Sequence, residues 1–509
     1  MYGGSGVITR QLLVLLVLIA AAFGGFVVFL PWNILVILIL TSILAVAYFA
    51  GAVFLASNPE RLPDWLHRAP LIWMVIFPLV VGAIVLRDIW SGVTVTALVF
   101  TLALLLVFLY YWLVVPLALV QKVSHQNWTR PDIPWPALTV LIPAYNEQEY
   151  VGRTIESVAA ATYPDDVSIV VIDDGSTDGT YAEACEYATE NTTVIQRANG
   201  GKHAALNEGL KHATTDIIVA VDADSVIAPD ALQLLVKEFD RNPEAGAIAG
   251  NIKVANRGSL ITNLQALEYI VGINTFRRAF DLLGVVTVVP GSLGAFKRGA
   301  LDAVGGYSGD TVTEDFDLTI EILKAGHAIH ASEGVVYTEG PETWHDLYNQ
   351  RLRWFGGNIQ TLLKHFEVFR NPQFGLLHRL GFPYIFLSLS MLPLLGLAVL
   401  GFLILAVIQG SMAVLLVIAV FFTLLQFLLS ALAIAIEHED MRLAAYAPFS
   451  IIGYKQFLDT VLLKSFYDVL AVKDVTWTNV RRARQEDTAE RDIPPEMDAE
   501  PMSVGRSRK

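Results

Sequence analysis

Cysteine is almost absent from this sequence, since Cys185 is the only one in 509 residues. A single thiol excludes intrachain disulfides and metal sites built from several cysteines. We expect Cys185 to be a small residue of the core. Charged residues are also scarce, at 17% of the chain, whereas hydrophobic residues reach 54% and the mean hydropathy is +0.51. This composition is too apolar for an ordinary soluble protein and predicts a membrane protein.

The apolar residues are concentrated at the two ends of the chain. Six uninterrupted stretches each come close to the ~20 residues that a helix needs to cross ~30 Å of hydrocarbon. They are Leu12–Leu30, Ile34–Ala56, Ala69–Leu86 and Val93–Val120 before the middle of the chain, and Tyr384–Ile408 and Met412–Ile436 after it. The sequence therefore predicts four transmembrane helices within residues 1–130, and transmembrane or interfacial helices within residues 378–475.

A seventh apolar stretch, Pro448–Val472, contains two Lys–Asp pairs at i,i+4 spacing, Lys455 with Asp459 and Lys464 with Asp468. Each pair can neutralise itself inside a packed bundle, the helix can lie in the membrane interface, or it can be an ordinary span. The sequence leaves these alternatives open. Residues 485–509 are polar and rich in Asp, Glu, Pro and Ser, which predicts a disordered tail.

Lys and Arg in the short loops indicate the orientation. One side of the membrane has Arg10, Arg61, Arg68, Lys122 and Arg130, and the opposite side has only Arg87. We therefore expect the N-terminus and the middle of the chain to be cytoplasmic, in a multi-pass protein surrounded by the lipids of the cell membrane.

The middle of the chain is acidic. Residues 137–370 contain 32 Asp and Glu against 17 Lys and Arg, a difference of −15, and the whole chain carries −14. A surface of this charge repels phosphate backbones, so we expect no nucleic-acid partner.

Residues 136–370 alternate short apolar runs with helical stretches. The runs Leu138–Ile142, Val167–Ile172, Thr193–Gln196 and Ile217–Val221 are each followed by a polar motif. Repeated strand, turn and helix units predict an α/β domain with a mostly parallel sheet covered by helices. In such sheets ligands bind beyond the carboxyl ends of the strands, which is where these motifs lie.

Two of the motifs suit a nucleotide. Asp174 follows a strand and precedes a Gly/Ser/Thr turn, where it can present a carboxylate to a base or ribose, although Ser176 or Asp178 could simply cap a helix there. Lys202 follows Gly200 and Gly201, which permit close backbone approach to a diphosphate, although the same residues also suit an ordinary turn.

Asp222 and Asp224 follow the fourth apolar run. Two carboxylates at i,i+2 spacing in a turn can share a hard divalent cation that bridges a nucleotide diphosphate. The alternative is a solvated pair in a loop, with Ser225 capping the helix that begins near Pro229. Because apolar burial does not explain two acids here, we favour the metal site.

Two further motifs lie downstream. Thr313 can cap a helix that starts with Glu314 and Asp315. Gln350, Arg353 and Trp354 share one face of a predicted helix, being i, i+3 and i+4. Arg353 could neutralise a diphosphate and Trp354 could stack on a sugar ring, or these residues could be surface arginines beside a Trp at the membrane interface.

From about Pro136 to the sixth apolar stretch, the chain resembles the processive family 2 glycosyltransferases, which include cellulose, chitin, hyaluronan and poly-N-acetylglucosamine synthases. The motifs that carry the resemblance occur in the family's order: Pro143–Glu147, Asp173–Thr180, Asp222–Asp224, Thr313–Asp315 and Gln350–Trp354. The resemblance implies a GT-A-like, Rossmann-like catalytic domain between two bundles of transmembrane helices.

The resemblance also implies roles for individual residues. Those assigned to substrate or nucleotide binding are Pro143, Tyr145, Glu147, Asp174, Lys202, Asp222, Gly291, Ser292, Gln350, Arg353 and Trp354. Asp174 resembles a uracil contact, Lys202 a diphosphate contact, and Asp222 with Asp224 the ligands of Mg²⁺ or Mn²⁺. Asp315 resembles the catalytic base, a carboxylate that removes a proton from the acceptor hydroxyl as the hydroxyl attacks the anomeric carbon.

Two stretches would connect this chemistry to the membrane. Leu260–Leu283 alternates apolar and polar residues at helical spacing, which suits an amphipathic interfacial helix or an ordinary surface helix. Pro290–Lys297 lies where related synthases place an acceptor-binding loop, and its small residues would let a sugar approach the backbone.

We therefore expect an inverting transferase that moves a sugar from a UDP-sugar donor to a growing polysaccharide and passes the product outward. The sugar that we favour is N-acetylglucosamine. Single-sugar transfer to a lipid carrier or glycolipid is one alternative. A membrane conduit or scaffold that binds a nucleotide without turnover is another.

Overall fold

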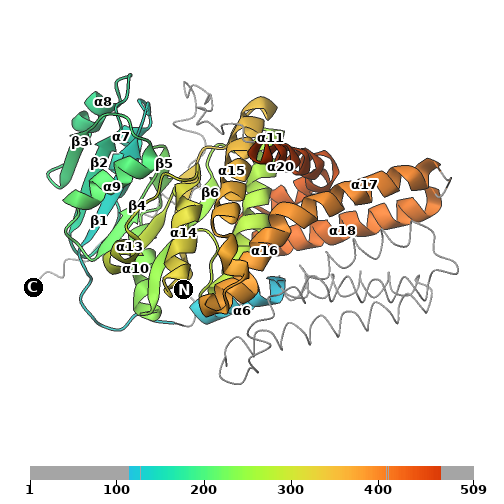
Figure 1. The fold of residues 1–509 in the computed structure, drawn as a ribbon, viewed down its shortest axis with the longest axis horizontal. Coiled ribbons are helices and arrows are strands. Elements are labelled where there is room, and N and C mark those ends of the chain that lie inside the picture. The colour runs from blue at the N-terminus through green and yellow to red at the C-terminus, as the bar shows by residue number, and fades with distance from the viewer. Residues whose placement is uncertain (1–113, 127, 409, 411, 472–509) are drawn as a thin grey trace, which may run out of the picture.

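The computed structural model of the protein describes residues 114–126, 128–408, 410 and 412–471 (Figure 1). The first three predicted membrane helices and the tail 485–509 lie outside these residues. Of the fourth, only the last residues are described, and they belong to helix α6, Val115–Gln126.

Eight strands form one sheet in the order β3-β2-β1-β4-β7-β6-β8-β5. They are β1 Leu138–Ala144, β2 Val167–Asp173, β3 Thr192–Gln196, β4 Ile217–Ala220, β5 Ser225–Ile227, β6 Ala245–Val254, β7 Gly294–Lys297 and β8 Ala328–Thr338. The predicted strands form the parallel part, in which β1 pairs with β2 and β4, and β2 pairs with β3.

The second half of the sheet is mixed. β7 runs antiparallel between β4 and β6, β6 is parallel to β8, and β5 is antiparallel to β8. Part of the segment Pro290–Lys297, which we expected to be a loop, is therefore a central strand. Only the turn before Gly294 remains as a loop, and it contains Gly291 and Ser292.

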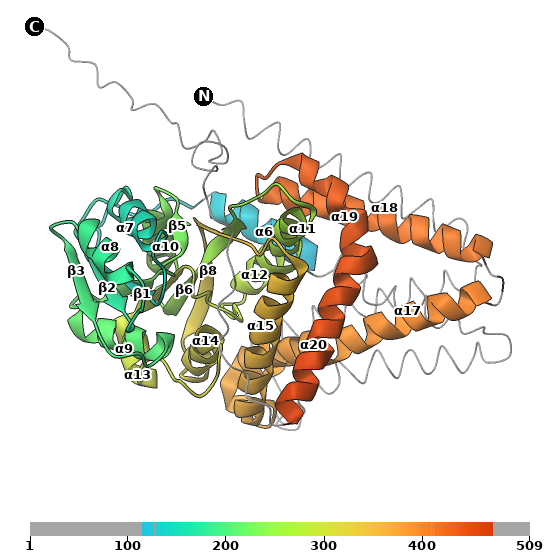
Figure 2. The same ribbon diagram turned by 90° about the horizontal axis from the view of Figure 1, so that it is seen from above.

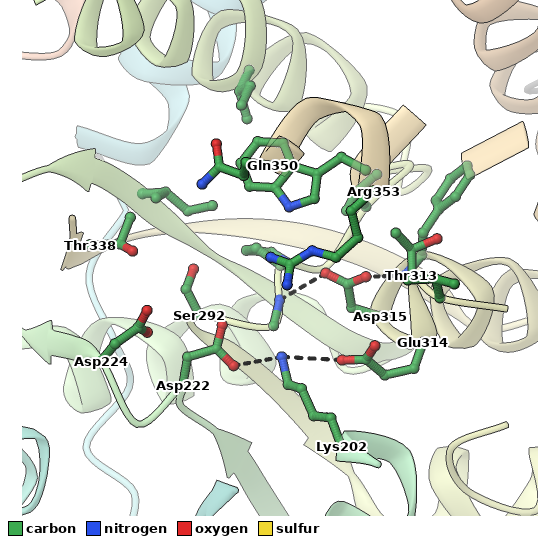
Figure 3. A pocket seen from close by; sticks show the side chains of 18 of the residues that line it. Lys202, Asp222, Asp224, Ser292, Thr313, Glu314, Asp315, Thr338, Gln350 and Arg353 are labelled. Carbon is green, nitrogen blue, oxygen red and sulfur yellow. Dashed lines mark hydrogen bonds and ion pairs between the residues drawn. The ribbon is translucent and has the colours of Figure 1, made fainter. Parts of the chain in front are cut away.

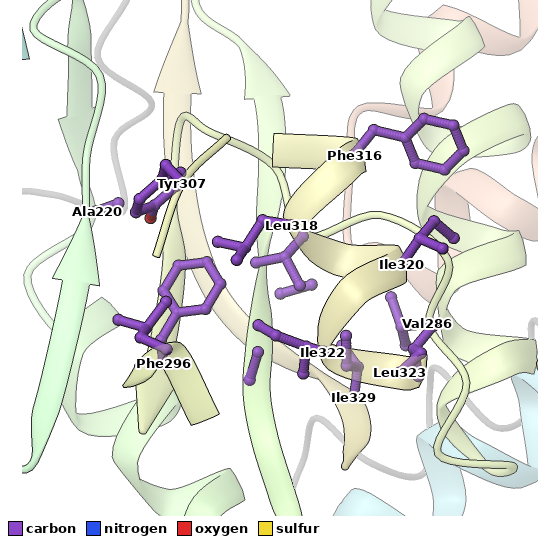
Figure 4. Packing of buried hydrophobic residues seen from close by; sticks show 14 of the residues in the cluster. Ala220, Val286, Phe296, Tyr307, Phe316, Leu318, Ile320, Ile322, Leu323 and Ile329 are labelled. Carbon is purple, nitrogen blue, oxygen red and sulfur yellow. The ribbon is translucent and has the colours of Figure 1, made fainter. Parts of the chain in front are cut away.

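Helices cover both faces of the sheet. They are α7 Val151–Ala159, α8 Thr180–Glu186, α9 Lys202–His212, α10 Ala231–Arg241, α13 Arg298–Val304 and α14 Glu314–Lys324. Strand residues alternate between two apolar clusters, so that Val140 and Ile142 pack with α7 and α10, whereas Leu141 packs with α9 and α14. Leu318 and Ile322 of α14 lie one helical turn apart and point toward the sheet (Figure 4).

The helical layer beside the sheet consists of segments that are distant in sequence (Figure 2). The α-helices are α11 Leu260–Glu268, α12 Thr275–Asp281, α15 Trp344–Lys364, α16 Phe382–Phe386, α17 Leu392–Ile408, α18 Met412–Ile436, α19 Ala447–Phe449 and α20 Lys455–Leu470. Four π-helical turns join some of them: η3 Tyr269–Asn274, η6 Leu377–Gly381, η7 Leu387–Met391 and η9 Ser450–Tyr454. Three short 3-10 segments are η4 Phe366–Phe369, η5 Pro372–Phe374 and η8 Met441–Tyr446.

The predicted amphipathic helix Leu260–Leu283 is built from α11, η3 and α12 rather than from one regular helix. Its polar residues are not directed toward solvent, because Gln265, Arg277, Arg278 and Asp281 are all buried. An interfacial helix and an ordinary surface helix would both expose the polar face of this segment. That part of both expectations is wrong.

Eight polar and charged side chains contact one another where α6, α12, β8 and the end of α18 meet. We call them the buried charge cluster. They are Gln121, Lys122, His125, Arg278, Asp281, His330, Glu333 and Glu437. Arg278 donates from Nε to Glu437 at 2.6 Å and from Nη2 to Glu333 at 2.8 Å. Asp281 lies 2.9 Å from ring nitrogens of both His125 and His330. These contacts attach α6 to the sheet domain.

The two Lys–Asp pairs of the last predicted stretch are present on α20. Lys455 donates to Asp459 at 2.7 Å, and Lys464 is paired with Asp468. The stretch is not one straight helix, because Ile452 and Gly453 have non-helical backbone angles. α20 then packs along α15, as Figure 2 shows.

Two more observations concern expectations from composition. Within the parts of the chain that the structure describes, no helix is both long enough and apolar enough to cross a membrane. Cys185 is exposed on α8, so its interpretation as a small core residue is wrong.

Candidate active site

A cavity of about 1180 Å³ lies at the carboxyl ends of the parallel strands and continues toward α12 and η7. Every residue that the sequence assigns to the site lines it: Pro143, Tyr145, Glu147, Asp174, Lys202, Asp222, Asp224, Gly291, Ser292, Asp315, Gln350, Arg353 and Trp354. The structure therefore gathers these residues in one place, although they are spread over more than two hundred positions of the chain.

The loops after β1 and β2 are bonded to each other. Ser176 accepts a hydrogen bond from the N–H of Asn146 at 2.9 Å, and Thr180 accepts one from the N–H of Glu147 at 2.8 Å. Ser176 is therefore a link between loops rather than a helix cap. The residue at the N-terminal end of α8 is Gly179, although Asp178 does accept from the N–H of Thr180.

Asp174 is 2% exposed, and its carboxylate organises the Gly200–Gly201 loop. It accepts hydrogen bonds from the N–H of Gly200 at 3.1 Å and of Gly201 at 2.7 Å, and it pairs with Arg197. Gly201 has φ +88°, a conformation that favours glycine, directly before α9 begins at Lys202. The role of Asp174 as a uracil contact stays a prediction, and its carboxylate also fixes the start of α9.

Lys202 lies between two acidic motifs (Figure 3). Its Nζ is 2.5 Å from Oδ1 of Asp222 and 3.1 Å from Oε1 of Glu314. Burial lowers the pKa of Lys202, but the carboxylates of Asp222, Glu314 and Asp315 outweigh it and hold the pKa well above its usual value. Lys202 is therefore a cation at neutral pH on the wall of the cavity.

Asp315 occupies the first turn of α14 with its side chain facing the turn that contains Gly291 (Figure 3). Its carboxylate accepts from the N–H of Gly291 at 3.1 Å and from the N–H of Phe316 at 2.8 Å. Burial, followed by the neighbouring Glu314 carboxylate, raises the pKa of Asp315 to about 6, although Lys202 and the two N–H donors act in the opposite direction. The result is a fixed carboxylate that is largely ionised at neutral pH.

Thr313 occupies the predicted position at the start of α14, but it does not cap the helix. Thr313 precedes α14, but its side chain caps no backbone N–H, and its Oγ1 finds no hydrogen-bond partner among the described residues. α15 approaches Thr313 closely, since a Cβ added to Gly357 would lie 2.7 Å from Oγ1 of Thr313.

The motif Gln350–Trp354 lies on α15, as predicted. Arg353 extends into the cavity toward Asp315 (Figure 3). Trp354 packs beside Tyr269, with ring centroids 6.5 Å apart, and Arg351 lies 4.3 Å from the centroid of its indole. Arg351 is fully buried and pairs with Glu268 at 2.8 Å, so the alternative of a surface arginine pair is wrong.

Residues 139–305 match the family model described as glycosyl transferase family 2. The chain carries a family 2 glycosyltransferase domain. It is 33% identical over 232 residues to a poly-beta-1,6-N-acetyl-D-glucosamine synthase of Staphylococcus epidermidis, covering 45% of this chain and 56% of the relative. A synthase of the same name from Staphylococcus aureus (strain COL) is 31% identical over 265 residues, covering 50% of this chain and 64% of the relative. The chain thus spans less than two thirds of the relatives it matches.

A solved structure supports the fold of the family 2 domain. The mannosyltransferase from Pyrobaculum calidifontis in complex with GDP-Man and Mn²⁺ superposes with a TM-score of 0.50 and 20% sequence identity. It covers 71% of this chain and all of its own. The expected GT-A-like α/β fold is confirmed for the sheet domain.

The turn that contains Asp222 and Asp224 could hold a divalent cation if a nucleotide supplies further ligands. Asp222 contacts Lys202, and Asp224 accepts from the hydroxyl of Ser225 at 3.3 Å. No group of three or more His, Cys, Asp or Glu side chains that could hold a metal ion occurs in the described residues. Two carboxylates are nevertheless a sufficient protein contribution for Mg²⁺ or Mn²⁺, which complete their coordination with phosphate oxygens and water. Ser225 is a residue of β5, not the cap of α10 that the alternative required.

The sequence did not indicate the contacts of two polar residues of the cavity. Glu314 was expected only in the first turn of a helix, but it contacts Lys202. Glu268 was assigned to an amphipathic surface, but it lines the cavity and accepts from Arg351 and from the hydroxyl of Tyr454. These contacts join residues more than eighty positions apart, so no local pattern could have indicated them.

Proposed function

We propose that this protein is an inverting transferase that extends a polysaccharide with N-acetylglucosamine from a UDP-sugar. The family 2 domain and the two Staphylococcus relatives named as poly-beta-1,6-N-acetyl-D-glucosamine synthases support the sugar and the polymer. The observation that carries the proposal is the position of Asp315, fixed by two backbone N–H groups in the same cavity as Lys202 and Asp222.

Asp315 acts as the base in this proposal. Its carboxylate takes the proton of the acceptor hydroxyl while that oxygen attacks the anomeric carbon of the donor. The N–H groups of Gly291 and Phe316 hold the carboxylate in place, so that little reorganisation is needed when the proton arrives. A pKa of about 6 keeps Asp315 ionised at neutral pH and close enough to neutrality to be an effective base.

Cationic side chains bind the donor in this proposal. Lys202 and Arg353 line the cavity on opposite sides of Asp315 and carry the charge that a nucleoside diphosphate requires (Figure 3). Asp222 and Asp224 would hold Mg²⁺ or Mn²⁺. When bound, that ion neutralises the charge that develops on the leaving diphosphate. Asp174 contributes by fixing the loop that begins α9 at Lys202.

The acceptor chain occupies the rest of the cavity in this proposal. A cavity of about 1180 Å³ exceeds the ~300–1,000 Å³ of ordinary small-ligand sites, so it has room for a donor and part of a saccharide chain. Trp354 offers a ring on which a sugar can stack. The predicted spans would embed the protein in the cell membrane, with the catalytic domain in the cytoplasm and the product leaving through the helices.

The experiment that tests the proposal supplies the purified full chain with a panel of labelled UDP-sugars and either Mg²⁺ or Mn²⁺, followed by mass analysis of the products. We expect a long polymer from UDP-N-acetylglucosamine. One sugar on a lipid would instead establish the alternative of single-sugar transfer. Absence of any product with every donor would refute transfer and favour a non-catalytic nucleotide-binding conduit.

The matched control is Asp315→Asn, which keeps the size of the side chain and removes the base. We expect this variant to bind UDP with the metal as the wild type does and to form no polymer. Polymer formation at the wild-type rate would eliminate Asp315 as the base while leaving the transferase assignment intact.

A further inference from the structure

A buried salt bridge adjoins Gln350 and Trp354 on α15. Its cation, Arg351, is fully buried, so it acts on a ligand only through its neighbours. Nη2 of Arg351 donates to Oε2 of Glu268 at 2.8 Å, and Nη1 donates to Oε1 of Gln350 at 2.6 Å. The guanidinium carbon lies 4.3 Å from the centroid of the Trp354 indole. One guanidinium therefore contacts two of the side chains that are predicted to bind substrate.

The contact of Arg351 with Trp354 joins a cation to an aromatic ring. Burial lowers the pKa of Arg351, but the Glu268 carboxylate outweighs it and raises the pKa above its usual value, so the guanidinium is charged. A guanidinium within about 6 Å of an indole centroid is attracted to the face of the ring, and more strongly when water is excluded. The orientation of the indole should therefore depend on where Glu268 holds the guanidinium.

The carboxylate of Glu268 has a second partner near the C-terminal end of the described residues. Oε2 of Glu268, the atom that accepts from Arg351, also accepts from the hydroxyl of Tyr454. Tyr454 is 4% exposed, and its ring packs with Leu264 and Leu347. Glu268 lines the cavity, whereas Tyr454 does not. The hydroxyl of Tyr454 is thus placed to influence a bound ligand through Glu268.

A break in the last helical stretch precedes Tyr454. Ile452 and Gly453 have non-helical backbone angles, and Gly453 has φ +95°, a conformation that favours glycine. The chain changes direction there, and α20 then packs along α15 (Figure 2). Ser465 of α20 donates to the carbonyl oxygen of Leu352 at 3.4 Å. The segment after the break therefore contacts the predicted binding motif at its backbone and, through Glu268, at its side chains.

We propose that Tyr454, Glu268 and Arg351 are positioning residues for the indole on which the acceptor sugar stacks. The contacts run from the Tyr454 hydroxyl to the Glu268 carboxylate and then to the Arg351 guanidinium, which lies over the indole. This inference rests on the proposed transferase function, in which Trp354 offers the stacking surface. A ring that is already held in one orientation loses less entropy when a sugar binds, so the three residues lower the KM for the acceptor.

The test measures extension of an N-acetylglucosamine oligomer by the full chain and by Tyr454→Phe, which removes one oxygen atom and keeps the buried ring. The KM for the oligomer should rise about 3- to 10-fold, a part of the ~10- to 100-fold that a hydrogen bond to a charged group is worth. The kcat and the dissociation constant of UDP should not change. Tyr446→Phe is the matched control, because the Tyr446 hydroxyl also contacts α11 but accepts from Asn263 at 3.2 Å. It should leave the KM unchanged.

A comparison in a second background separates positioning from a general loosening of the fold. In Trp354→Ala, the further change Tyr454→Phe should alter the KM less than about 2-fold, because the ring that it positions is absent. Arg351→Lys keeps the charge but not the fork that donates to two partners, so it should also raise the KM for the oligomer.

Four results would overturn the inference. They are an unchanged KM in Tyr454→Phe, an equal rise in Tyr446→Phe, an equal rise in the Trp354→Ala background, and a weaker UDP complex in Tyr454→Phe. Absence of extension by the wild type would instead contradict the proposed function itself.

Discussion

The raised pKa of Asp315 predicts a specific loss of activity in acid. A carboxyl group with a pKa of about 6 is about 90% ionised at pH 7 and about 10% ionised at pH 5, so the rate should fall about 10-fold between these values. A carboxyl group with the ordinary pKa of 3.8 would remain more than about 90% ionised at pH 5, and the rate would hardly change. The sign follows from the base role, because only the ionised form accepts a proton.

The assay is kcat/KM for transfer from UDP-N-acetylglucosamine between pH 4.5 and 8, which reports the ionisation of the free enzyme. Asp315→Asn should reduce the rate about 10²- to 10⁴-fold and abolish the acid limb. Glu314→Gln removes the neighbouring negative charge that helps to raise the pKa, so the acid limb should move to lower pH. A wild-type profile that stays flat down to pH 4.5, or an acid limb that persists in Asp315→Asn, would refute the assignment of Asp315 as the base.

Three further predictions concern metal binding, acceptor binding and the path of the growing chain in the cavity. Asp224→Asn should weaken metal-dependent UDP binding by about 10-fold or more in titration calorimetry, and unchanged affinity with Mn²⁺ would exclude a direct role in metal binding. Trp354→Ala should raise the KM for the acceptor while leaving the dissociation constant of UDP unchanged, because the indole offers a stacking surface; a weaker UDP complex would place the donor there instead. A Cβ at Gly272 meets no atom within 4 Å, and Gly272 lines the cavity, so Gly272→Leu should shorten the products. Gly299→Leu, at an equally open position outside the cavity wall, should leave product length unchanged; equal shortening by both variants would contradict the acceptor path.

The parallel half of the sheet could be predicted from the sequence because its strands are short runs of β-branched and apolar residues that end in turn motifs. Val167–Ile172 is such a run, and it forms β2 with one added residue. The antiparallel half gave no such signal. β6 and β7 are rich in Ala and Gly, which have low strand propensity, and their pairing depends on tertiary contacts.

The place of a candidate residue in the cavity was predictable where the residue follows a buried strand, as Asp222 and Asp224 do, and their role in metal binding stays a prediction. It was not predictable where a side chain acts through a distant partner. The contact of Lys202 with Glu314 spans more than a hundred residues, and the pairing of Glu268 with Arg351 spans more than eighty. The polar residues of Leu260–Leu283 suggested an exposed face because amphipathic spacing does not distinguish water from a polar protein interior.

The buried charge cluster has a practical consequence for where the chain can be cut. A fragment limited to residues 136–370 would keep Arg278, Asp281 and Glu333 but would lose their partners on α6 and at Glu437. Arg278 would keep Glu333 and Asp281 would keep His330, but each lost hydrogen bond to a charged group contributes about 1.5–3 kcal/mol, and a whole domain is stable by only about 5–15 kcal/mol. We therefore expect the isolated fragment to be less stable than the same residues in the full chain. Its expression and refolding should improve when the flanking helices are included.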